Sequence, residues 1–122
     1  MNEEKKEPQT IEMKLAAEPF EMIKSGQKTL EIRLYDEKRK KIKIGDILIL
    51  SKSDDGSEQI KAQVVALHKF QTFQELFGTQ LFSKTGWSGM TAQEAAQIMY
   101  QFYTKKQEKT FGVLGIEIKT LR

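Results

Sequence analysis

Apolar and polar residues alternate along four stretches of the chain, the pattern of half-buried β-strands. The stretches are residues 10–15, 28–35, 60–70 and 110–121. A fifth stretch, residues 47–50, is continuously apolar, which predicts a strand buried on both faces. The dipeptide Asp55-Gly56 follows it and predicts a hairpin tip.

Two of these strand patterns carry further detail. In residues 60–70 the even positions form one apolar face, and His68 belongs to it. In the last strand the apolar positions change from odd to even, which predicts a β-bulge near Gly112 or Gly115.

Helix patterns separate the strands. A short helix is predicted in residues 18–26, where Pro19 suits the first turn and Gly26 suits the C-terminal stop. Residues 72–78 predict one or two further helical turns.

The strongest helix pattern covers residues 91–103. Thr91 and Glu94 have the spacing of a capping box. An apolar stripe is predicted to pack on the core, and the polar residues 105–109 close the helix. The stripe consists of Ala95, Ile98, Met99 and Phe102.

The order of the elements indicates the fold class. Helices do not alternate regularly with strands, so a doubly wound parallel sheet is excluded. We predict an α+β fold in which a small, mostly antiparallel β-barrel is flanked by two or three helices. The 122 residues suit a single domain, with residues 1–9 as a polar N-terminal tail and residues 10–122 as the domain.

Composition narrows the class of function. The absence of cysteine and the single histidine exclude disulfides, thiolate nucleophiles and multi-histidine metal sites, so no metal or cofactor is expected. No apolar run is long enough for a membrane span, and the N-terminus lacks the hydrophobic core of a signal peptide. These features predict a cytoplasmic protein. The net charge of +3 weakly favours a polyanionic partner.

The candidate chemistry lies in the sequence Gly26-x-Lys28-x-x-Glu31-x-Arg33. On a strand Glu31 and Arg33 share one face and can pair, whereas Lys28 has the opposite parity and reaches Glu31 only if the chain is not yet pleated there. One interpretation is a solvated surface pair worth at most ~1 kcal/mol. The other is a ligand cleft. There Arg33 holds phosphate or carbonyl oxygens, Glu31 accepts amino protons of a base or acts as general base, and Lys28 binds an anion or acts as nucleophile.

This motif resembles that of the ASCH domain family, in which Gly-x-Lys-x-x-Glu-x-Arg follows a short helix. The four motif residues match without a gap, and the resemblance extends from about Glu12 to the end of the chain. It implies a PUA-like fold, with Lys28, Glu31 and Arg33 in a cleft beside the barrel. It also implies binding of RNA or a nucleotide.

Some small bacterial members of the family are amidohydrolases that deacetylate N4-acetylcytidine with a lysine, a threonine and a glutamate. Lys28 matches the lysine, but Glu31 stands at the threonine position and Ser88 at the glutamate position. Two of the three catalytic positions therefore differ. An amidohydrolase would have to use Lys28 with Glu31 as the proton shuttle.

Three further features are candidates for ligand contact. Tyr35 and Trp87 have side chains that stack on bases, although packing of Trp87 on the barrel is the alternative. A basic segment is a candidate for contact with the RNA backbone or, alternatively, a solvated loop. Its residues are Lys38, Arg39, Lys40, Lys41 and Lys43.

The sequence thus leaves three hypotheses. The favoured one is an RNA- or nucleotide-binding module, the second a hydrolase of a modified nucleoside, and the third a protein-interaction domain. The last requires a contiguous exposed apolar patch, which the sequence does not display.

Overall fold

Five strands and four α-helices make up the part of the chain that the computed structural model describes, residues 7–53 and 58–121. The strands are β1 (Thr10–Leu15), β2 (Leu30–Leu34), β3 (Ile47–Lys52), β4 (Gln59–Phe70) and β5 (Val113–Thr120). The α-helices are α1 (Ala17–Lys24), α2 (Phe73–Phe77), α3 (Ala92–Met99) and α4 (Lys105–Phe111). Two 3-10 helices, η1 (Arg39–Lys41) and η2 (Gln80–Lys84), complete the described elements.

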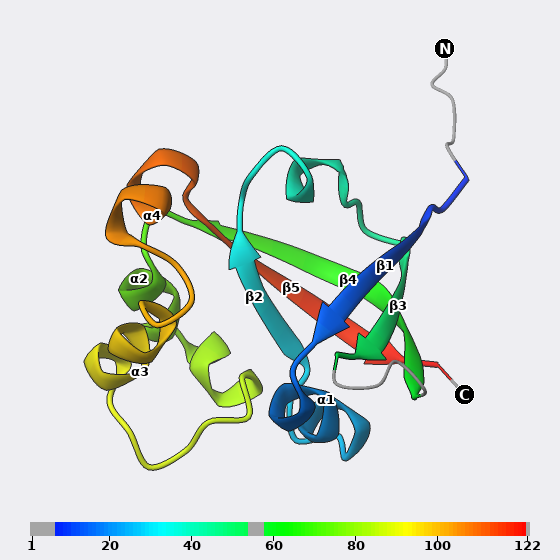
Figure 1. Cartoon of the computed structure of the whole chain (residues 1–122), viewed down its shortest axis with the longest axis horizontal. Helices are drawn as coiled ribbons and strands as arrows, with labels where there is room; N and C mark the ends of the chain where they lie inside the picture. The colour runs from blue at the N-terminus through cyan, green and yellow to red at the C-terminus, as the bar shows by residue number, and fades with distance from the viewer. Residues whose placement is uncertain (1–6, 54–57, 122) are drawn as a thin grey trace.

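The strands form one sheet in the order β1-β3-β4-β5-β2. β1 and β3 are parallel, and the other three pairs are antiparallel. The sheet curls into a half-barrel, so its two edge strands, β1 and β2, both lie in front of β4 and β5 (Figure 1). The predicted α+β class and small, mostly antiparallel barrel are confirmed, with four α-helices in the described residues instead of two or three.

The half-barrel buries two apolar clusters, one on each face. The first lies inside the curl, between β1, β3, α1 and the inner residues of β4 and β5. The second lies between the outer face and α2 and α3, where Leu30, Ile32 and Leu34 of β2 are buried. Successive side chains of a strand point to opposite faces. Because these three residues of β2 pack against the helices, Glu31 and Arg33 point into the curl.

β5 is buried on both faces, which explains its change of parity. Val113 packs in the outer cluster, and Leu114 packs in the inner one. The bulge predicted near Gly112 or Gly115 is wrong, because the register shift lies on β4 between Val64 and Ala66. The predicted single even face of residues 60–70 is broken at this shift.

Four other predictions need correction or lie outside the described residues. The helix predicted for residues 91–103 ends at Met99, and α4 follows as a separate helix with its own Thr104 capping box. Phe102 is 68% exposed and is not part of the core stripe. In β3 only Leu48 and Leu50 are fully buried, so one face is half-exposed. The Asp55-Gly56 tip lies outside the described residues.

No helix within residues 7–53 and 58–121 combines the length and apolarity needed to cross a membrane. The same residues contain no group of three or more histidine, aspartate and glutamate side chains placed to hold a metal ion.

Candidate functional site

Lys28, Glu31 and Arg33 form one continuous chain of ionic contacts. Lys28 Nζ lies 3.5 Å from Glu31 Oε1, and Arg33 Nε donates to Glu31 Oε2 at 2.9 Å. Lys28 lies in the turn between α1 and β2, and its backbone N–H donates to the oxygen of Met22 in α1, so strand parity does not apply to it. The condition under which Lys28 reaches Glu31 is therefore met.

The Lys28 ammonium is buried. Lys28 and Glu31 are each only 7% exposed, and Lys28 Nζ donates to the backbone oxygen of Thr85 at 3.3 Å. Burial lowers the pKa of Lys28 below its ordinary value, and Arg33 lowers it further, while Glu31 opposes both effects. A larger share of Lys28 is thus neutral than for a surface lysine.

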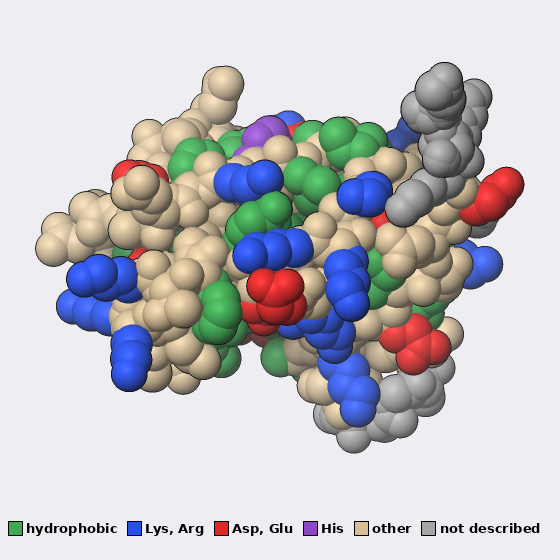
Figure 2. Space-filling model, turned by 90° about the horizontal axis from the view of Figure 1, so that it is seen from above, with side chains coloured by type: hydrophobic (Ala, Val, Ile, Leu, Met, Phe, Trp, Pro, Cys, Tyr) green, Lys and Arg blue, Asp and Glu red, His purple; other side chains and the backbone are tan. Residues whose placement is uncertain are grey.

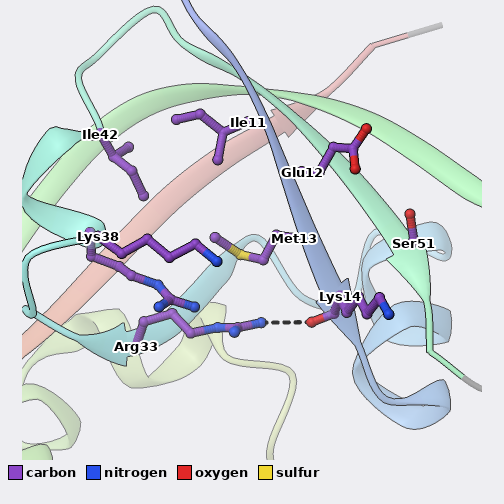
Figure 3. A pocket seen from close by; sticks show the side chains of 9 residues that line it. Ile11, Glu12, Met13, Lys14, Arg33, Lys38, Ile42 and Ser51 are labelled. Carbon is purple, nitrogen blue, oxygen red and sulfur yellow. Dashed lines mark hydrogen bonds between the residues drawn. The ribbon is translucent and has the colours of Figure 1, made fainter.

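Arg33 connects the two edge strands of the sheet. Its Nη2 donates to the backbone oxygen of Lys14 on β1 at 3.0 Å (Figure 3), while its Nε is held by Glu31. Two of the guanidinium nitrogens are thus fixed by protein acceptors. The third, Nη1, makes no hydrogen bond within the described residues.

A pocket of about 450 Å³ lies beside Arg33, in the seam between β1 and η1 (Figure 3). Among the described residues its wall combines cationic and apolar side chains with one carboxylate, that of Glu12. Lys28 and Glu31 do not line it, because they lie buried behind Arg33. The lining residues are Ile11, Glu12, Met13, Lys14, Arg33, Lys38, Arg39, Ile42 and Ser51.

The basic segment divides between two hollows. Lys38 and Arg39 line the pocket beside Arg33, and Arg39 Nη1 lies 3.5 Å from Asp36. Arg39 Nε is buried and has no hydrogen-bond partner within the described residues. Lys40, Lys41 and Lys43 line a second hollow of about 740 Å³ next to residues 7–9. Figure 2 shows the molecule from above, turned by 90° from Figure 1, and lysine and arginine side chains spread across the middle of the face seen there.

The other predicted ligand contacts lie outside the pocket wall. The Tyr35 ring lies under the ammonium groups of Lys69 at 4.8 Å and Lys40 at 5.6 Å. Trp87 packs against Phe77 with ring centroids 5.6 Å apart. Gly26 has a φ of +86° and allows the turn between α1 and β2.

His68 belongs to a different cluster. Its Nε2 lies 3.0 Å from Glu117 Oε1, and Lys84 Nζ donates to Glu117 Oε2 at 2.6 Å. Hydrogen bonds from Lys84 and His68 lower the pKa of Glu117. The three residues link η2 to β4 and β5.

Sequence reasoning missed three residues near the motif. Lys14 supplies the acceptor for Arg33, and Thr85 supplies the acceptor for Lys28. Burial raises the pKa of Tyr103, which also lies within the electrostatic influence of Arg33 and Glu31. No local sequence signal marks these residues, because they approach the motif only through the tertiary fold.

Comparison with known proteins identifies the family. The protein-family model described as "ASCH domain" matches residues 13–122 of this sequence. The chain belongs to the ASCH domain family. Its PUA-like half-barrel agrees with solved ASCH domains: that from Lactobacillus crispatus JV V101 superposes with a TM-score of 0.65 at 10% identity, covering 92% of this chain and 79% of that one.

Two other solved structures have higher sequence identity to this ASCH domain and match almost its whole length. "Hypothetical protein PH0355" has 35% identity and a TM-score of 0.81, with coverage of 92% of this chain and 99% of that one. Protein PF0455 from Pyrococcus furiosus has 34% identity and a TM-score of 0.73, with coverage of 93% and 98%. Among curated proteins no significant match was found.

Proposed function

We propose that this ASCH domain binds RNA or a nucleotide through the pocket beside Arg33. The observation that carries the proposal is the convergence of three cationic side chains on one pocket of about 450 Å³. These side chains are those of Arg33, Lys38 and Arg39. The volume lies within the range of roughly 300 to 1,000 Å³ that small-ligand sites occupy.

The way Arg33 is held supports recognition of an anion. Its Nε and Nη2 are fixed by Glu31 and by the backbone of Lys14, so the side chain needs little ordering when a ligand arrives. The remaining guanidinium nitrogen, Nη1, is well suited to donate to a phosphate oxygen. In this proposal Glu31 and Lys28 position Arg33 from behind, and Tyr35 and Trp87 supply peripheral contacts.

The test is the affinity for a fluorescein-labelled single-stranded RNA as a function of salt. We expect affinity to fall steeply between about 50 and about 200 mM salt, because bound phosphates release counterions. Lys38→Ala should weaken binding and reduce the slope of log K against log salt by about 0.7 to 1.

Lys106→Ala is the matched control, because Lys106 is an exposed lysine on α4 and does not line the pocket. It removes the same charge and should leave the slope unchanged. Absence of any RNA or nucleotide binding would contradict the proposed function. An equal loss in Lys38→Ala and Lys106→Ala would move the binding site away from the pocket.

A second candidate is hydrolysis of an acylated nucleoside such as N4-acetylcytidine. The observation that favours it is the buried Lys28 amine, whose pKa is lowered by burial and which lies 3.5 Å from a carboxylate. A neutral amine beside a proton acceptor is the state a lysine needs to act as nucleophile or base. Release of cytidine, measured by chromatography, should vanish in Lys28→Met. Equal rates in the two proteins would end this candidate.

A further inference from the structure

We propose that the pocket beside Arg33 selects a phosphomonoester, the terminal phosphate of an RNA strand or of a free nucleotide. An internal phosphodiester or an unphosphorylated nucleoside should bind more weakly. The inference rests on the proposed function and narrows it to one chemical group.

The charge balance around the pocket favours a dianion. Lys28, Glu31 and Arg33 together hold two cations and one anion. Arg39 is matched by Asp36. Lys38 has no acidic partner within the described residues, so this end of the pocket carries two positive charges in excess. A phosphomonoester carries a charge of about −1.5 to −2 at pH 7, whereas a phosphodiester carries only one negative charge.

The excess charge is confined to one side of the pocket. In Figure 3 the Arg33 and Lys38 side chains extend toward β1 from β2 and the η1 loop. Glu12 and Lys14, which have opposite charges, project from the other side of β1. A dianion is therefore best neutralised between Arg33 and Lys38.

Unused donors belong to two arginines that line the pocket. Arg33 Nη1 makes no hydrogen bond within residues 7–53 and 58–121. Arg39 Nε is buried without a partner in these same segments. A terminal phosphate offers one more unesterified oxygen than a phosphodiester, and such an oxygen is the acceptor that Arg33 Nη1 lacks.

The shape of the pocket also favours a chain end. The hydrogen bond between Arg33 and Lys14 O ties β2 to β1 at its border. An RNA strand running along the seam would have to break this bond, whereas a terminal group enters without doing so. The buried side chains of Met13 and Ile42 form an apolar wall on which the attached ribose or base can rest.

The experiment compares one RNA oligonucleotide with a 5′-phosphate, a 3′-phosphate or hydroxyl groups at both ends. We expect at least one phosphorylated form to bind about tenfold more tightly than the hydroxyl form, the effect of one added charge-assisted hydrogen bond. The preference should decline below about pH 6, where the phosphomonoester loses its second charge. AMP and adenosine serve as competitors. If AMP competes and adenosine does not, a free nucleotide is enough to fill the pocket. If phosphorylated RNA is preferred but AMP does not compete, the ligand is the phosphorylated end of an RNA strand. Both results support the inference.

Two variants assign the preference to this pocket. Lys38→Ala and Arg33→Lys should bring the ratio of the two affinities close to one, while Lys106→Ala should leave it unchanged. The Lys38 side chain is exposed and makes no hydrogen bond or ion pair within the described residues, so its variant remains informative if Arg33→Lys is unstable. A full preference in both variants would overturn the assignment. Equal, salt-dependent affinities for all RNA forms would overturn the inference and leave the proposed function standing, whereas no binding at all would overturn both.

Discussion

Arg33 on β2 donates a hydrogen bond to the backbone oxygen of Lys14 on β1, 3.0 Å away, across the open side of the half-barrel. β1 and β2 are the two edges of the sheet and do not pair with each other. Glu31 holds the same guanidinium at 2.9 Å. One arginine thus both closes the seam and forms part of the pocket wall.

Replacement of Arg33 by lysine should weaken this closure. A lysine ammonium can contact Glu31 but lacks the second nitrogen that reaches Lys14. We expect Arg33→Lys to lower the free energy of unfolding in urea by about 1–2 kcal/mol, the cost of one or two hydrogen bonds. Amides of β1 should also exchange faster with solvent.

Arg39→Lys is the comparison for that experiment. Arg39 pairs with Asp36 within its own loop, and its side chain makes no hydrogen bond to β1 within the described residues. Arg39→Lys should leave the hydrogen-exchange rates of the β1 amides unchanged. Equal effects of the two substitutions would show that the contact with Lys14 does not hold the seam.

Glu31→Gln tests the buried charge between Lys28 and Arg33. Removing one partner of a buried ion pair is costly, and we expect a loss of about 2–4 kcal/mol at pH 7. Glu31 raises the pKa of Lys28, so the variant lowers that pKa further below its unfolded value of 10.5. Between the folded and unfolded pKa values the unfolded chain binds more protons, so stability rises with pH.

The deficit of Glu31→Gln should therefore shrink as pH rises toward 10.5, where Lys28 is neutral in the folded variant. Urea titrations of both proteins at several pH values measure this difference in the free energy of unfolding. Glu18→Gln, at an exposed position of α1, removes the same charge and should show no such trend. A deficit independent of pH would mean that Lys28 stays protonated without Glu31.

Local pattern was sufficient to predict most of the fold. Alternation marked β1, β2 and β4, and the Thr91 capping box marked the start of α3. The local pattern led to wrong predictions where tertiary packing determines the burial of a strand or the end of a helix. β5 has apolar residues of both parities because both of its faces are buried, which sequence alone does not distinguish from a bulge. The end of α3 was missed because residues 100–103 keep the apolar spacing after the helix has ended.

The site was predictable only in part. Contact between Glu31 and Arg33 follows from strand parity, but the direction of Lys28 depends on the turn after α1. That Lys28 and Glu31 are buried, leaving Arg33 to line the pocket, depends on the Thr85 loop and on the curl of the sheet. Residues 14, 85 and 103 come from distant segments, so no spacing rule connects them to the motif.

Lys28→Met separates a structural role of Lys28 from a functional one. A buried ammonium whose pKa is lowered by burial is costly to the fold, and methionine fills a similar volume without a charge. We expect the free energy of unfolding to stay within about 1 kcal/mol of the unmodified protein or to increase, since Glu31 keeps its bond to Arg33. A loss above about 2 kcal/mol would instead identify the contact with Glu31 as a main source of stability.

Gly86 tests how closely the loop after η2 packs over Lys28. A Cβ at Gly86 would lie 2.8 Å from Met22 Sδ and 3.2 Å from Lys28 Cβ, and its φ is +88°. Gly89 has a similar φ of +74° but no atom within 4 Å of its Cβ position. Both alanine variants pay about 1 kcal/mol or more for the left-handed backbone. Gly86→Ala must in addition displace the Met22 side chain and crowd Lys28 Cβ, at about 1 kcal/mol or more. Urea unfolding should therefore show Gly86→Ala to be the less stable variant by at least about 1 kcal/mol. Equal stabilities would mean that the Met22 side chain turns away, or that the loop shifts, without cost.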